Sequence, residues 1–172
     1  MGCICDAGLI GAHVKCFDGQ IETDRIGYFS SSYIIKGKNG TIMNMKQEEI
    51  VSEIRRMCGN VQLLPLLGWH FKYNGQLYFY VQGSDESMIR FYIPFVEGVP
   101  LHKTEQLKEA VNDTNRNVKF IKALLSENED VKVSLDYDHK ISEKESVGEI
   151  VPHIIKALDF AASYLVKRMH SN

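Results

Sequence analysis

Apolar and polar side chains follow two different periods in the part of the chain after residue 44. Helical spacing runs from about Met45 to Cys58, from His102 to Asn115, and from Val147 to Met169. Five shorter runs between these stretches alternate apolar and polar residues, as strands with one buried face do. The pattern predicts the order α-β-β-β-α-β-β-α, which is an α+β fold with an antiparallel sheet packed by helices.

Turn residues divide the five strand-like runs into two groups. Asn74-Gly75 lies between the first two runs and is the strongest short signal for a hairpin. Gly83 to Asp85 should turn the chain before the third run, and Pro94 should end that run because proline cannot donate a ladder hydrogen bond. The polar tip Glu127 to Asp130 joins the last two runs into a second hairpin.

The ends of the predicted helices carry residues with known capping preferences. Asn44 can cap the first helix, and Gly59 follows its last apolar position. Ser142 and Glu145 have the spacing of a capping box before the last helix. Pro152 lies inside that helix and lacks an N–H for the helical hydrogen bonds, so we expect a kink or a restart there.

The first 44 residues differ from the rest of the chain. They mix glycine, cysteine and other small residues without a sustained period, and Asn39-Gly40 is typical of a tight hairpin turn. We expect residues 1–44 to form an N-terminal arm that is poorly ordered or a small hairpin. Residues 45–172 should then form a single chaperone-like α+β domain.

The composition is that of a soluble globular domain, with 44% hydrophobic residues, 24% charged residues and a net charge of −2. Lysine and arginine do not outnumber aspartate and glutamate, which argues against a nucleic-acid partner. No apolar run is long enough to cross a membrane, and the N-terminus lacks the pattern of a signal peptide. The four cysteines have no disulfide-like spacing, so we expect a cytoplasmic protein without a membrane partner.

The spacing of candidate ligands does not support a metal or phosphate site. Cys3, Cys5, His13 and Cys16 lack the paired spacing of standard zinc sites. The acidic tip at 127–130 lacks the glycine and the terminal glutamate of a calcium loop, and "GLIG" near the N-terminus lacks the lysine of a phosphate loop. We therefore expect no metal and no cofactor.

A hydrolase that uses Cys58 and a histidine is one alternative. His70, His139 and His153 are candidate bases, but none has a nucleophile beside it in the sequence. Cys58 lies on the apolar face of the first helix, where cysteine usually behaves as a small hydrophobic residue. We therefore expect no catalytic residue.

Aromatic residues gather on the three strands of the first group. Alternation places Tyr78, Tyr80 and Tyr92 opposite the apolar row Leu77–Phe79–Val81. Tyrosine suits surfaces that combine an apolar part with a water-exposed part. We therefore expect these three tyrosines and Leu107 to contribute to a partner-binding surface. The alternatives are a core covered on both sides and a sheet that stacks RNA bases.

The stretch from Asn112 to Ile141, followed by a long helix, resembles the YbjN-like family, which is also described as bacterial sensory transduction regulators. The points of likeness are the asparagines Asn112, Asn115 and Asn117, the acidic turn at 127–130, and a strand ending in Asp136-Tyr137-Asp138. The resemblance covers residues 44–169, whereas the first 44 residues and Pro152 depart from the pattern. It implies the fold of the type III secretion chaperones and a dimeric, non-enzymatic module that binds segments of other proteins.

These observations together predict a bacterial, cytoplasmic homodimer that acts as a chaperone-like or regulatory adaptor. It would capture segments of partner proteins in apolar grooves or by pairing at a sheet edge. A small-ligand-binding regulatory domain is an alternative, and it would contain a closed cavity. A hydrolase would instead contain a deep pocket with Cys58 beside a histidine.

Overall fold

The chain divides into two compact units, Met1–Ile42 and Met43–Asn172, in a computed structural model. The structure describes residues 5–7, 12–17, 20–24, 45–65, 67–82, 87–126, 131–142 and 144–170. In the first unit, β1 (Cys5–Ala7), β2 (Ala12–Phe17) and β3 (Gln20–Asp24) form an antiparallel sheet in that order. The hairpin predicted at Asn39-Gly40 lies outside the described residues.

The second unit contains a six-stranded antiparallel sheet with the order β4-β5-β6-β7-β9-β8. Its elements in chain order are α1 (Met45–Cys58), β4 (Val61–Leu64), β5 (Gly68–Tyr73), β6 (Gln76–Gln82), β7 (Met88–Ile93), α2 (Thr104–Asn117), β8 (Lys122–Ser126), β9 (Lys132–Lys140) and α3 (Val147–His170). The predicted α+β fold and both hairpins are confirmed. β4 was not predicted, because four residues are too few to show a period.

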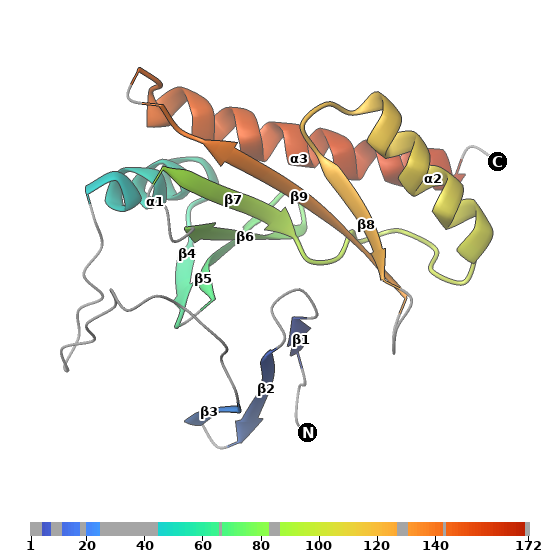
Figure 1. The fold of residues 1–172 in the computed structure, drawn as a ribbon, viewed down its shortest axis with the longest axis horizontal. Coiled ribbons are helices and arrows are strands. Elements are labelled where there is room, and N and C mark those ends of the chain that lie inside the picture. Colours follow the sequence, from blue (N-terminus) through green and yellow to red (C-terminus); the bar gives the residue numbers. More distant parts are fainter. Residues whose placement is uncertain are drawn as a thin grey trace. The chain divides into compact units, whose positions relative to one another are not determined.

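All three helices of the second unit contribute to one core with the same face of the sheet (Figure 1). α1 contacts β4 and β5, α2 contacts β8, and α3 contacts β7, β9 and both other helices. Each helix buries the apolar stripe that the sequence predicts, and α3 buries the longest one, which includes Val151, Ile155 and Leu158. The helices therefore form one layer and the sheet forms the other.

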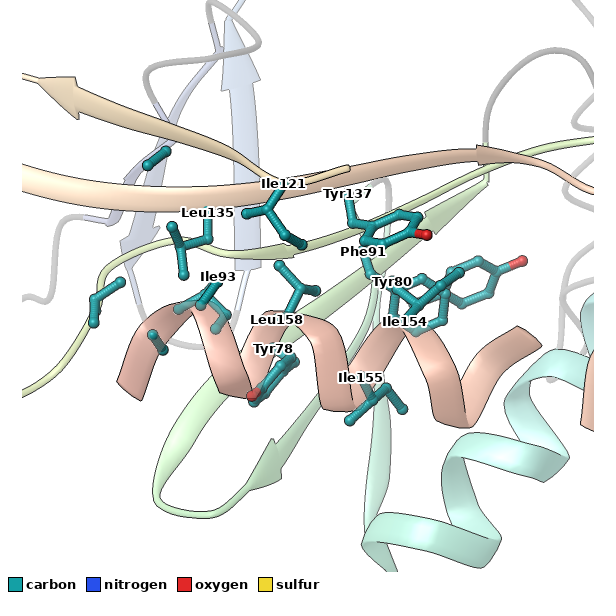
Figure 2. Packing of buried hydrophobic residues seen from close by; sticks show 14 of the residues in the cluster. Tyr78, Tyr80, Phe91, Ile93, Ile121, Leu135, Tyr137, Ile154, Ile155 and Leu158 are labelled. Carbon is teal, nitrogen blue, oxygen red and sulfur yellow. The ribbon is translucent and has the colours of Figure 1, made fainter. Parts of the chain in front are cut away.

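Aromatic side chains of the sheet fill the space below α3. Tyr78, Tyr80 and Phe91 are fully buried and belong to the same core cluster as Ile154 and Leu158 of α3 (Figure 2). The ring centroids of Tyr80 and Phe91 are 5.1 Å apart at an interplanar angle of 27°, which is a stacked arrangement. Stacking adds to the free energy that comes from removing these large rings from water.

α3 continues through Pro152 as one helix from Val147 to His170, so the restart expected at this proline is wrong. The capping-box residues lie in the turn before the helix, where the Ser142 N–H donates to the Glu145 carboxylate at 2.7 Å. Packing explains why the helix persists. Residues around the proline, such as Val151 and Ile154, are fully buried, and their burial outweighs the loss of one helical hydrogen bond.

The edge strand β8 is closed by a side chain of α2. The Asn115 side-chain amide donates to the Ala123 carbonyl at 2.9 Å, and its side-chain oxygen accepts from the Ala123 N–H at 2.8 Å. Asn115 thus replaces, at one residue, the two backbone hydrogen bonds that another strand would make. An edge blocked in this way resists pairing with another chain.

Candidate binding face

The face of the sheet opposite the helices, which we call the outer face, carries one continuous row of side chains. Strand register places His70, Phe79, Tyr92, Asp136 and Lys122 directly opposite one another across β5, β6, β7, β9 and β8. Residues that oppose each other in an antiparallel pair point to the same face. Among the described residues, the hydrophobic core contains none of these five side chains.

The first three side chains of this row form a set of neighbouring rings. The centroids of Phe79 and Tyr92 are 5.0 Å apart at an interplanar angle of 15°, so these rings are stacked. The His70 ring lies 5.8 Å from Phe79 at 32°. Phe79 and Tyr92 are only partly buried. Because Phe79 and Tyr92 stack on each other, each has one ring face occupied within the sheet.

Charged groups adjoin the aromatic row. The Arg90 guanidinium donates two hydrogen bonds to the Asp138 carboxylate, one from Nε and one from Nη2. The Nη2–Oδ2 distance is 3.1 Å. Burial raises the pKa of Asp136, as does the nearby Asp138 carboxylate, while Arg90 and Lys122 act in the opposite direction. Burial together with Asp136 also raises the pKa of Tyr92 to about 12, so its hydroxyl stays protonated at neutral pH.

The outer face has a positive charge balance, although the whole chain has a net charge of −2. The register assigns five basic side chains and two acidic ones to it among the described residues, a formal net charge of +3. The acidic side chains are Asp136 and Asp138. The basic side chains are Lys72, Arg90, Lys122, Lys132 and Lys140.

Three of the four residues predicted for the partner surface lie in the core. Tyr78, Tyr80 and Leu107 have no exposed area, so they cannot line a surface of the folded monomer, and that expectation has to be corrected. Their rings and side chains fill the space between the sheet and the helices, where apolar burial is most favourable. Tyr92 is the one predicted residue that lies on the outer face.

The two faces of β6 are the reverse of those predicted. Phe79 lies on the outer face with Leu77 and Val81, whereas Tyr78 opposes the buried Phe71. The hairpin turn contains the signal that could have shown this. A two-residue turn at Asn74-Gly75 pairs Phe71 with Tyr78, and paired residues share a face. Tyr78 therefore had to lie on the same face of the sheet as Phe71, which alternates with the polar residues His70 and Lys72 along β5.

The residues considered for catalysis are not brought together. Burial raises the pKa of the Cys58 thiol to about 11, which leaves very little thiolate at neutral pH. His139 Nε2 lies 3.2 Å from a carboxylate oxygen of Glu145, which is an ion pair when the imidazole is protonated. The described residues contain no group of three metal-ligating side chains. The zinc candidates Cys3, Cys5, His13 and Cys16 belong to the segment whose side chains the structure does not describe.

The surface of the second unit contains hollows formed by described residues, and two of them bear on the hydrolase alternative. One is bordered by Asn74, Glu97 and Asp159, and the other by Phe95, Leu101 and Val133. Neither hollow contains Cys58 or a histidine, so they do not have the lining that a hydrolase of this kind requires. In the part of the chain that the structure describes, no helix is long and apolar enough to span a lipid bilayer.

The chain is similar in structure to a solved protein, although its sequence matches little that is known. No family model and no curated protein sequence matches the chain. The crystal structure of YbjN from E. coli, described as a proposed transcription regulator, is similar with a TM-score of 0.49 and 9% sequence identity. The similarity covers 79% of this chain and 93% of YbjN.

Proposed function

We propose that this chain is a non-enzymatic binding module that captures segments of partner proteins on its outer face. The observation that carries the proposal is the row of rings from His70 through Phe79 to Tyr92, which lies outside the hydrophobic core. Aromatic side chains with partly exposed, rigid rings provide large contact areas at a small loss of conformational entropy.

The contrast between the two faces of the sheet supports a binding role for the outer one. The inner face and the helices already bury Tyr80, Phe91 and Leu135 completely, so the core is complete without the outer rings. Phe79 and Tyr92 therefore contribute little to the core that they do not touch. Partly exposed aromatic clusters of this kind are typical of protein interfaces.

The candidate catalytic groups support a binding role over a hydrolase. A Cys58 nucleophile would need a lowered pKa and a histidine in contact, whereas burial raises the pKa of this thiol to about 11. The Cys58 side chain packs against the hydrophobic core instead of lining either hollow. These features are typical of a structural cysteine.

Selection from a random dodecapeptide library displayed on phage tests the proposal. Peptides selected on the full chain should bind the double variant Phe79→Ala/Tyr92→Ala at least tenfold more weakly, which corresponds to about 1.4 kcal/mol. Phe160→Ala is the matched control, because Phe160 is an aromatic residue of α3 with 61% exposure and lies away from the sheet. Equal binding to the double variant, or no selected peptide, would contradict the proposal.

A further inference from the structure

The charges of the outer face indicate the chemistry of its partner. Within the described part of the chain, Arg90 is neutralised by Asp138, but no ion pair engages Lys72, Lys122 or Lys140. Lys72 lies near one end of β5, Lys122 at the start of β8, and Lys140 at the end of β9. The three ammonium groups thus surround the aromatic row on several strands, and they would attract a negatively charged partner.

The orientation of the rings favours the same partner. Phe79 and Tyr92 stack on each other at 15°, so each ring covers one face of the other, while the ring edges, which carry partial positive charge, are not covered by this stacking. Carboxylate and carbonyl oxygens suit such edges better than ammonium groups do. Nucleic-acid bases stack on open ring faces, and this row has fewer of them because neighbouring rings cover one another.

We propose that the outer face binds protein segments in which Asp or Glu side chains flank apolar ones, an inference that rests on the proposed function. The partner's apolar side chains pack against the Phe79 and Tyr92 rings, and its carboxylates pair with Lys72, Lys122 and Lys140. Asp136 lies in the same row and excludes partners that would place a carboxylate directly above β9.

The composition of the selected dodecapeptides is the first test. Asp and Glu should be at least twofold more frequent among them than in the starting library, with Lys and Arg depleted. If the selection yields peptides that depend on Phe79 and Tyr92 but are not acidic, this inference is wrong while the proposed function stands. If it yields no such peptide, the proposed function is wrong and this inference falls with it.

Charge reversal is the second test, measured by fluorescence anisotropy with one selected peptide. Lys122→Glu/Lys140→Glu should weaken binding at least tenfold, and raising the salt concentration should weaken binding to the unmodified chain. Lys156→Glu is the control, because Lys156 is an exposed lysine of α3 outside the outer face. Unchanged binding to the double variant overturns the inference. So does tighter binding of a single-stranded oligothymidine than of the peptide, because the partner would then be a nucleic acid.

Discussion

Asp136 is a buried carboxylate for which the described residues provide no hydrogen-bond donor, only the nearby charges of Arg90 and Lys122. Burial raises its pKa in the folded state, so its favourable contribution to stability is present at low pH and is lost as the pH rises through that pKa. We expect Asp136→Asn to be more stable than the unmodified chain at pH 7, and the difference to vanish near pH 3. Urea unfolding at pH 7 and near pH 3 measures this difference in the free energy of unfolding.

Asp113 is the matched control, because its pKa shifts in the opposite direction. The Tyr164 hydroxyl donates to it at 2.8 Å and lowers its pKa, with further help from Arg168. Its contribution is therefore present at neutral pH and lost as the pH falls, so Asp113→Asn should be less stable than the unmodified chain at pH 7. If Asp136→Asn and Asp113→Asn changed the free energy of unfolding in the same direction at pH 7, the opposite pKa shifts assigned to these two carboxylates would be wrong.

Cys58 should react slowly with alkylating reagents. A pKa of about 11 leaves far less thiolate at pH 8 than an ordinary cysteine has. After allowance for the greater nucleophilicity of a more basic thiolate, we expect alkylation to be roughly tenfold slower or more. The measurement uses iodoacetamide on a chain in which Cys3, Cys5 and Cys16 are replaced by serine. Unfolding the chain in urea should raise the alkylation rate of Cys58 to that of an ordinary cysteine. Fast alkylation of Cys58 in the folded chain would instead support its role as a nucleophile.

The errors at the residue scale have a common physical source. Alternation along β6 separates two faces but does not say which one is buried, since a row of Leu, Phe and Val and a row of tyrosines can both be buried. Tertiary packing decided it: the wide space under α3 holds the larger rings of Tyr78 and Tyr80. Cross-strand pairing through the Asn74-Gly75 turn contains this information, whereas the period of a single strand does not.

At the scale of elements, Asn115 should control the edge of β8. Asn115→Ala removes two hydrogen bonds to Ala123, and we expect the free energy of unfolding to fall by about 1–2 kcal/mol. Faster hydrogen exchange at the Ala123 amide should accompany this loss. Asn117→Ala is the control, because the Asn117 side chain donates to Asp113 within its own helix and also interacts with Tyr164 of α3, so its partners are on helices and not on β8. Equal effects of the two variants would show that closing the edge contributes nothing specific.

Helices were easier to predict than strands, for physical reasons. α1 has the predicted bounds, since an amphipathic stripe of 14 residues gives several repeats of its period. β4 has only four residues, and three of them, Val61, Leu63 and Leu64, are apolar, so no alternation is visible. Nor could the sequence indicate the role of Asn115 at the edge, because the side chain reaches a strand that is eight residues away.

For the whole second unit, the layered arrangement separates stability from binding. The helices cover the inner face, where Tyr80, Phe91 and Leu135 are completely buried, whereas the outer face has its aromatic rings beside charged groups. Substitutions such as Phe79→Ala should therefore change binding more than folding, which is what makes them usable as tests. The homodimer expected from the sequence stays a prediction, and light scattering of the full chain will test it.

At the same scale, we propose that Met43–Asn172 folds without the residues before it, close to the boundary predicted at residue 44. Its core is contiguous and includes residues of all three helices and of the sheet, so a chain that begins at Met43 keeps every contact of that core. Its cooperative unfolding free energy should lie within about 1 kcal/mol of that of the full chain. Loss of cooperative unfolding in the shorter chain, at conditions where the full chain unfolds in one step, would show that residues 1–42 complete the fold.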